Sequence, residues 1–248
     1  MKIAVCVSHV PDTASKIKIG ADGRSIDPAG ITYIINPYDE FAIEEALKAK
    51  EQTGSEVVVI SLGGDANKET IRKALAMGAD QGILIKAEEY FDSFTVAYAL
   101  AKEIRAQNCE LVFMGKQSVD YDNCITGQLT AEILGYNCIS VVVSFKLENN
   151  KITAEREIEG GREVVETELP AIITAQKGLN EPRYASLKGI MASKKKVIEE
   201  KQVTGVNNLT EIIKLTLPTV KQPGRIIGTD ASAVPELVRL LREEAKVI

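Results

Sequence analysis

The 248-residue sequence has no tryptophan and only one histidine, His9, and its four cysteines never form a C-x-x-C pair. A single imidazole and scattered thiols do not supply the ligands of an ordinary closed zinc site. The one histidine also leaves little material for a Ser or Cys triad, and we interpret His9 as a polar loop residue rather than a general base. These absences argue against structural zinc, a disulfide framework and most hydrolase mechanisms.

Long apolar runs and an excess of positive charge are missing as well. No run approaches the roughly 18 apolar residues of a membrane-spanning helix, and the first run, at 2–7, is too short for a signal peptide. The formal net charge is −5, from 30 Lys plus Arg against 35 Asp plus Glu, which gives no electrostatic attraction to nucleic acid. We therefore expect a reduced, cytoplasmic protein that does not insert into membranes and does not bind nucleic acid.

Common nucleotide-binding and catalytic motifs are also absent. No G-x-G-x-x-G follows the first apolar run, and Gly115-Lys116 is no P-loop because Glu110 stands where the first glycine belongs. The sequence has no G-x-S-x-G nucleophile motif either. Any nucleotide site must therefore be of a less common type.

What the chain does contain is an alternation of short apolar runs and amphipathic stretches. The apolar runs cover 2–7, 57–60, 82–85 and 111–114, and the amphipathic stretches cover 38–50, 65–77 and 93–107. Continuous apolar runs are typical of strands buried on both faces, and the stretches between them have helical spacing. We expect Asp65 and Asp92 to cap two of the helices. The pattern predicts an α/β fold, a mostly parallel sheet with flanking helices.

After Gly135 the pattern changes to alternating and β-branched residues. Such segments lie at 140–148, 151–159 and 162–169. Asn149-Asn150 and Gly160-Gly161 separate them, and both dipeptides are hairpin turn signals. We therefore predict an antiparallel ribbon that extends the parallel sheet, followed by a return to the sheet at 171–175.

The chain is predicted to divide near residue 204. Residues 1–204 are expected to form one α/β domain, whereas 205–248 show no sustained period until a helix expected over 232–244. The tail has too few apolar residues for a core of its own. It either packs on its own domain or forms an arm on a partner, and the residues alone leave both open.

The segment 115–128 is a candidate ligand loop between an apolar strand and a helix. It lies at the carboxyl edge of the predicted sheet, where open α/β folds bind ligands, and its small polar residues leave backbone amides free for an anion near a helix N-terminus. Asp120 and Asp122 would repel a phosphate, so we expect them to accept ribose hydroxyls or to cap the helix. A long capped loop without a ligand is the equally weighted alternative.

A second unusual segment, 179–191, combines apolar bulk with charges and interruptions by Pro and Gly. Tyr184, Leu187, Ile190 and Met191 are its large apolar residues. Exposed apolar groups flanked by charges are typical of an interaction site. The more ordinary alternative is a loop that folds these groups back onto the core.

Four ordered blocks of the sequence resemble the β subunit of electron transfer flavoproteins. They are Asn36-Pro37-Tyr38, Ala74 to Asp80, Gly115 to Gln128, and Leu179 to Tyr184. The resemblance implies an adenine-nucleotide-binding α/β domain in a heterodimer whose α subunit holds most of the FAD, with the tail 205–248 as an arm on that subunit. It also implies an electron carrier rather than an enzyme. Electrons would come from flavin dehydrogenases such as the acyl-CoA dehydrogenases of fatty acid β-oxidation and pass to a membrane quinone oxidoreductase.

The resemblance further assigns site residues to this chain. The positions that match a structural AMP site are Cys6, Asn36, Pro37, Tyr38, Asp39, Leu62, Gly115, Lys116, Gln117, Ser118, Val119, Asp120, Tyr121, Asp122, Asn123, Cys124, Ile125 and Thr126. Leu187 matches the apolar anchor that docks on a dehydrogenase, with Tyr184, Ile190 and Met191 beside it. Two alternatives remain: an electron-bifurcating β subunit with a second FAD in place of AMP, and a nucleotide-binding regulatory module without a redox role.

Overall fold

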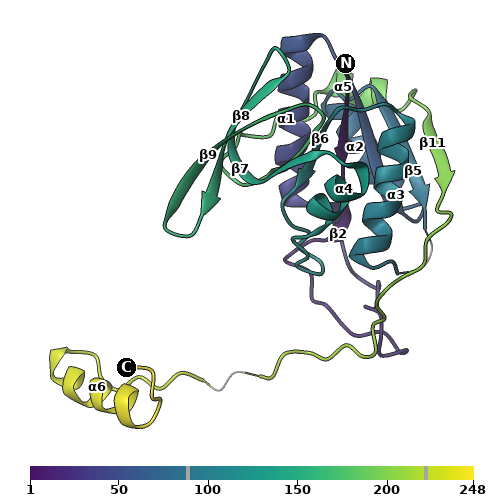
Figure 1. Ribbon diagram of the computed structural model, residues 1–248. Coiled ribbons are helices and arrows are strands. Elements are labelled where there is room, and N and C mark those ends of the chain that lie inside the picture. Colours follow the sequence, from purple (N-terminus) through teal and green to yellow (C-terminus); the bar gives the residue numbers. More distant parts are fainter. Residues whose placement is uncertain (88–89, 221–222) are drawn as a thin grey trace.

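The structure, a computed structural model, describes residues 1–87, 90–220 and 223–248. Within these residues one nine-stranded sheet forms the centre of the molecule, in the order β11-β5-β4-β1-β6-β10-β7-β8-β9 (Figure 1). The strands are β1 (Lys2–Cys6), β4 (Glu56–Gly63), β5 (Gln81–Lys86), β6 (Leu111–Gly115), β7 (Asn137–Glu148), β8 (Lys151–Ile158), β9 (Gly161–Glu168), β10 (Ala171–Ala175) and β11 (Ile198–Gln202). A separate antiparallel pair joins β2 (His9–Pro11) to β3 (Tyr33–Ile35). The predicted α/β class is confirmed.

Helices cover both faces of the parallel part of the sheet. They are α1 (Pro37–Thr53), α2 (Asn67–Met77), α3 (Ser93–Ala106) and α4 (Thr126–Leu134). Two further helices are the short α5 (Leu187–Ser193), which packs beside α2, and α6 (Val234–Glu243) in the tail. Apolar side chains of α1 and α2 pack with one face of the central strands, and those of α3 and α4 pack with the other. The strands are therefore buried on both faces, which is why their sequences are continuous apolar runs rather than alternating ones.

The antiparallel ribbon leaves the sheet through the long strand β7. Its first residues pair with β10 in parallel, and its later residues pair with β8 in antiparallel fashion. The strand bends at Val141, whose φ of 62° lies in the left-handed region. The predicted turns are confirmed, because Asn149, Asn150 and Gly160 all have positive φ values between paired strands.

The helix starts show one correct prediction and one error. Asp92 is the N-cap of α3, and its side chain accepts a hydrogen bond from the backbone N–H of Thr95. Asp65 does not cap α2, which begins at Asn67. Its carboxylate instead pairs with Lys68 at 2.7 Å and with Lys86 at 3.4 Å. The ion pairs draw the side chain away from the helix amides.

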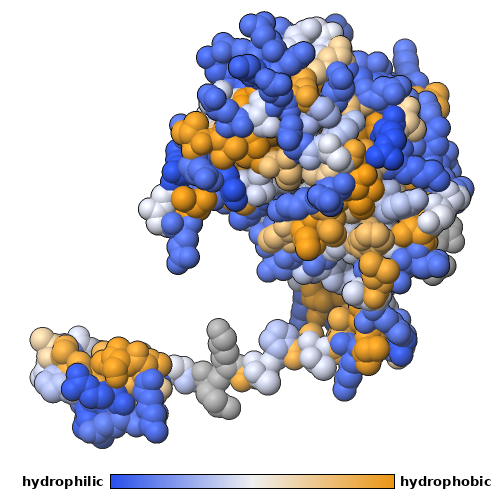
Figure 2. Space-filling model, in the orientation of Figure 1, coloured by the Kyte–Doolittle hydropathy of each residue, from blue (hydrophilic) through white to orange (hydrophobic). Residues whose placement is uncertain are grey.

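The tail, residues 205–248, begins beside the α/β domain of residues 1–204, which we call the body, and then extends away from it. After β11 the chain reaches α6, and no residue of α6 is buried against the rest of the described chain (Figure 1). Apolar side chains gather on one side of this helix (Figure 2), as expected from the spacing of Val234, Leu237, Leu240 and Leu241. In the described residues, no helix is both long and apolar enough to cross a membrane.

Candidate functional site

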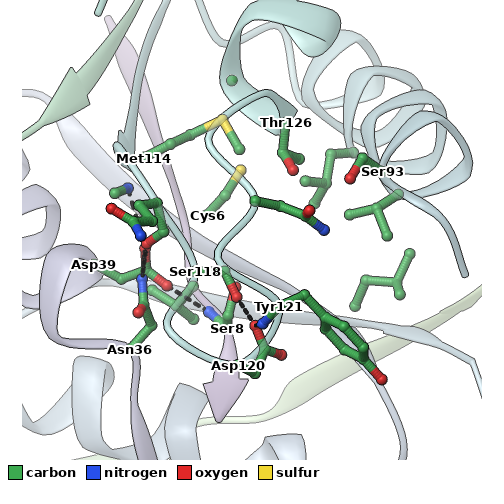
Figure 3. A pocket seen from close by; sticks show the side chains of 18 of the residues that line it. Cys6, Ser8, Asn36, Asp39, Ser93, Met114, Ser118, Asp120, Tyr121 and Thr126 are labelled. Carbon is green, nitrogen blue, oxygen red and sulfur yellow. Dashed lines mark hydrogen bonds between the residues drawn. The ribbon is translucent and has the colours of Figure 1, made fainter. Parts of the chain in front are cut away.

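A pocket lies at the carboxyl ends of β1, β4 and β6, where α1, α3 and α4 begin (Figure 3). Cys6 and Met114 come from β1 and β6, Asp39 comes from the first turn of α1, and Ser93 and Thr126 come from the starts of α3 and α4. In the main sheet, β4 is the next strand after β1 in the sequence and lies on one side of β1, whereas β6 lies on its other side. Open α/β sheets bind ligands at such a switch point.

Most of the residues assigned to a nucleotide site from the sequence line this pocket. They are Cys6, Asn36, Asp39, Leu62, Gly115, Lys116, Gln117, Ser118, Asp120, Tyr121, Asn123 and Thr126. They come from segments that are far apart in the chain and meet only because the strands are parallel. The fold therefore brings together the first strand, the start of α1 and the loop after β6.

The remaining assigned residues belong to the same segments but lie outside the pocket lining. They are Pro37, Tyr38, Val119, Asp122, Cys124 and Ile125. The Tyr38 ring lies below the Lys116 ammonium group, 5.1 Å from Nζ to the ring centroid. The N–H of Val119 donates to Asn36 Oδ1 at 3.3 Å. These two contacts join the start of α1 to the loop after β6.

Asp39 is the buried polar centre of the site. Its carboxylate accepts hydrogen bonds from the N–H of Ser8 at 2.7 Å, from the N–H of Gly115 at 3.0 Å and from the Asn36 amide at 2.9 Å. A β-carbon at position 115 would collide with the Asp39 carboxylate, so this position requires glycine. Burial raises the pKa of Asp39 to about 7, although the three donors act in the opposite direction.

Asn36 ties the start of α1 to the loop after β6. It is 1% exposed, and its amide donates to the Gln117 carbonyl oxygen at 2.8 Å as well as to Asp39. In that loop, the Ser118 hydroxyl donates to Asp120, and the Gln117 amide donates to Asp122. Burial raises the pKa of Asp120, which lines the cavity. Asp120 and Asp122 both shape the loop through these hydrogen bonds, and Asp120 also lines the cavity.

Helix α4 presents free backbone amides to the cavity. Ile125 occupies its N-cap position and is 49% exposed, and no side chain in the described chain caps this helix. Cys124, just before it, is an exposed free thiol. Thr126 and Gly127, the first two residues of α4, both line the pocket. An uncapped helix N-terminus that opens into a pocket favours an anionic group there.

Sequence reasoning missed one wall of the pocket. Tyr90, Phe91 and Ser93, at the start of α3, line it, and the Tyr90 ring packs against Tyr121 with 5.5 Å between the ring centroids. The signal that could have found this wall was available, because the predicted N-cap Asp92 placed the start of α3 at the same edge of the sheet as the ligand loop.

His9 also lines the pocket, and it lies in the short strand β2 rather than in a loop as expected. Its ring stacks on Tyr33 with 4.8 Å between centroids, and its Nδ1 lies 2.7 Å from the Thr70 hydroxyl. Burial lowers the pKa of His9. The stacked, hydrogen-bonded ring is a structural element of the pocket wall.

The segment 179–191 presents its apolar residues to solvent, so the alternative of a loop folded onto the core is wrong. Tyr184 is 99% exposed, Leu187 83% and Met191 71%, and Ile190 is 40% exposed. Part of the segment forms the short helix α5, which packs beside α2. Large apolar side chains of this exposure within one segment are uncommon on a surface that has no partner.

Ion pairs and hydrogen bonds to α1 fix the base of this segment. Arg183 donates from Nε and Nη2 to the two carboxylate oxygens of Glu44 at 2.8 and 2.9 Å, and from Nη1 to Glu51 at 2.5 Å. Asn180 donates to the Phe41 carbonyl oxygen at 2.9 Å. The two parallel hydrogen bonds of the planar guanidinium group fix the orientation of Arg183 relative to α1. The exposed apolar groups therefore stand on a rigid base.

Comparison with known proteins agrees with this geometry. The electron transfer flavoprotein domain family matches residues 25–205. The chain is 41% identical to the electron transfer flavoprotein subunit beta of Bradyrhizobium diazoefficiens, with 100% of both chains covered. It is 37% identical to the subunit beta of Bacillus subtilis, again with 100% of both covered, and 38% identical to that of Sus scrofa, with 100% of this chain and 99% of the other covered. The chain therefore belongs to the electron transfer flavoprotein family, as a β subunit.

Proposed function

We propose that this subunit binds a structural AMP in the pocket between β1 and β6 and supports an FAD that the α subunit mainly holds. The observation that carries the proposal is the uncapped N-terminus of α4, which opens into a pocket at the switch point of the sheet. The amides near Thr126 and Gly127 fit a phosphate group, and Asp120 fits hydroxyl donors of a ribose. Cys6, Leu62 and Met114 supply apolar surface for a base.

The protein groups bind and orient, and the flavin supplies one-electron and two-electron chemistry when it is bound. Within the part of the chain that the structure describes, no cluster of three or more His, Cys, Asp or Glu side chains could hold a metal ion. We propose that this chain acts as an electron-carrier subunit, as the membership of the electron transfer flavoprotein family supports. The four cysteines, all in described segments, are free thiols, which fits the reducing cytoplasm that we propose as its location.

We propose that the segment 184–191 docks on flavin dehydrogenases, such as the acyl-CoA dehydrogenases of fatty acid β-oxidation. Leu187 is the anchor, with Tyr184, Ile190 and Met191 around it. Its 83% exposure and the rigid attachment through Arg183 support this role. The carrier would then deliver electrons to a membrane quinone oxidoreductase.

We further propose that residues 205–248 form an arm on the α subunit. The apolar side of α6 lacks a partner among the described residues of this chain. An amphipathic helix of this kind gains its stability from packing against another surface. The α subunit of the heterodimer supplies that surface.

Extraction of nucleotides from the purified heterodimer tests the function. We expect about one AMP and one FAD per heterodimer, measured by chromatography after denaturation. Two FAD without AMP would contradict the AMP assignment and indicate the electron-bifurcating type. A colourless protein that never co-purifies with a flavin-binding partner would instead indicate a nucleotide-binding regulatory module.

A further inference from the structure

One buried carboxylate, that of Asp92, serves two distant segments at once. Its Oδ1 accepts the hydrogen bond from the Thr95 N–H at 2.9 Å and thereby caps α3. Its Oδ2 accepts hydrogen bonds from the N–H of Leu209 at 2.6 Å and of Thr210 at 2.8 Å, at the beginning of the arm. Asp92 is only 4% exposed. The start of the arm is therefore fixed to the start of α3.

Asn208 completes this arrangement from the arm side. Its Oδ1 accepts a hydrogen bond from the Asp92 N–H at 2.9 Å, and its Nδ2 donates to the Tyr90 carbonyl oxygen at 2.9 Å. Burial raises the pKa of Asp92, but the amides of Thr95 and the arm outweigh it and lower the pKa, so the carboxylate stays ionised. We name Asp92 together with 208–210 the Asp92 clamp.

The clamp holds the backbone of one wall of the pocket. Tyr90, Phe91 and Ser93 flank Asp92 and line the cavity, and the Tyr90 ring packs against Tyr121 on the opposite loop. The arm residues 208–210 do not belong to the lining of this cavity. Their effect on a ligand there must therefore pass through the backbone at Tyr90 and Asp92.

We propose that the Asp92 clamp is a positioning element of the pocket, in which the arm segment 208–210 keeps Tyr90 and Phe91 in place as a wall. Loosening the arm then weakens retention of the ligand, although no arm residue touches it. By reciprocity, a ligand in the pocket strengthens the docking of 208–210. The identity of the ligand rests on the proposed function, whereas the link between arm and wall does not.

Two substitutions loosen the clamp in different ways. Asn208→Ala removes both side-chain hydrogen bonds and leaves the α3 cap intact. Asp92→Asn keeps an N-cap of equal quality, because Oδ1 can still accept from Thr95, but it places an NH₂ group against the amides of Leu209 and Thr210. Lys102→Ala is the matched control, because Lys102 Nζ donates to the Thr204 hydroxyl at 2.7 Å and ties the chain just before the tail to α3 without involving the wall.

The first measurement uses the heterodimer and follows alkylation of Cys6 by iodoacetamide with peptide mass spectrometry. Cys6 lines the pocket and is 4% exposed. We expect Asn208→Ala and Asp92→Asn to speed its labelling by roughly fivefold to thirtyfold, which corresponds to the loss of one to two hydrogen bonds. Labelling of Cys109, which is buried outside this pocket, should stay slow and thus excludes general unfolding.

Hydrogen exchange of 206–215 and AMP binding complete the test. We expect faster exchange of this segment and weaker AMP binding in both clamp variants, with Lys102→Ala close to wild type. Unchanged exchange in Asn208→Ala, or unchanged Cys6 labelling when the segment is loosened, would overturn the clamp. If the wild type holds neither AMP nor a second FAD, the proposed function fails, and Cys6 labelling still decides whether the arm positions the wall.

Discussion

At the scale of single residues, Asp39 shows how one buried carboxylate can organise a site without facing solvent. Its three donors come from the end of β1, the start of α1 and the end of β6. Both carboxylate oxygens are occupied by the protein, so Asp39 positions the loops around the pocket. Because burial raises its pKa to about 7, the folded protein binds a proton more tightly here than the unfolded chain does.

This raised pKa predicts a specific pH dependence. The contribution of protonated Asp39 to the free energy of unfolding is fully present below about pH 4. It is lost as the pH rises to about 7, the pKa of Asp39 in the folded protein. Relative to Asp39→Asn, which does not titrate, the wild type should lose up to about 1.4 kcal/mol of stability per pH unit across this window. Thermal unfolding of the heterodimer at pH 5, 6, 7 and 8 measures the difference.

Asp22→Asn is the control for this series. Hydrogen bonds from the backbone N–H of Arg24 and Ser25 lower the pKa of Asp22, so its contribution is constant above about pH 4. The difference between the wild type and Asp22→Asn should therefore be flat between pH 5 and pH 8. A flat profile for Asp39→Asn as well would show that Asp39 does not titrate in this range.

The sequence placed Asp39 in the site but did not reveal this role. Ser8 and Gly115 are far apart in the chain, and only the parallel pairing of β1 and β6 brings both amides to one carboxylate. The wall at Tyr90 and Phe91 was missed for a related reason, since neither residue carries a recognisable motif. Most residues that line the pocket were predictable, whereas the contacts that hold them in place were not.

At the scale of elements, the short helix α5 combines exposure with rigidity. Ser186 caps it through a hydrogen bond from the Gly189 N–H, and Arg72 of α2 donates to the Lys196 carbonyl oxygen at 2.8 Å just beyond its end. A β-carbon at Gly189 would collide with the Ala76 carbonyl oxygen, so α5 lies very close to α2. Docking on a rigid element costs less conformational entropy than ordering a flexible loop.

We therefore expect Leu187→Ala to slow electron acceptance from the natural dehydrogenase without changing flavin content. The side chain is 83% exposed, so its loss should leave the fold unaffected. In a partner pocket it contributes about 1.5 to 3 kcal/mol, which corresponds to roughly a tenfold to 150-fold loss of affinity. Stopped-flow reduction at varied concentration of the heterodimer separates this loss of affinity from a slower electron transfer step.

Val164→Ala provides the comparison. Val164 is 64% exposed on β9, at the far edge of the sheet, and loses a similar aliphatic group. Its reduction kinetics should match those of the wild type. Equal kinetics for Leu187→Ala and wild type would show that the anchor lies elsewhere.

The elements themselves were largely predictable, because buried parallel strands leave continuous apolar runs. The runs at 2–7 and 111–114 correspond closely to β1 and β6. The start of α2 was wrong because an acidic residue before a helix can cap it or pair with lysines, and local sequence does not distinguish these outcomes. The exposure of Leu187 and Met191 was not predictable in the same way, because it depends on the ion pair between Arg183 and Glu44. That pair joins residues that are far apart in the sequence.

At the scale of the whole molecule, the chain consists of a body and an arm that differ in what stabilises them. The described arm residues form hydrogen bonds to the body as far as Leu215, whose N–H donates to the Gly23 carbonyl oxygen at 2.8 Å. Arg24 and Glu211 add an ion pair of 2.9 Å nearby. Beyond this point, the described residues show no hydrogen bond or ion pair to the body.

Removal of residues 216–248 should therefore affect assembly rather than the fold of the body. We expect the shortened chain to show the far-ultraviolet circular dichroism of the folded body, and to co-purify with the α subunit at a strongly reduced level. Leu237→Asp, which places a charge on the apolar side of α6, should have the same effect, and Arg242→Ala should not. Undiminished co-purification of the shortened chain would contradict the arm on the α subunit.

The position of β10 has a consequence for biosynthesis. β10 lies between β6 and β7, although it follows β7 in the chain by way of β8 and β9. During translation, β7 therefore emerges before the strand that joins it to the centre, and β11 at the other edge emerges later still. Large proteins with such long-range pairings fold slowly and expose unpaired strand edges on the way. The part of the sheet between β6 and β7 can therefore close only after residue 175 has left the ribosome.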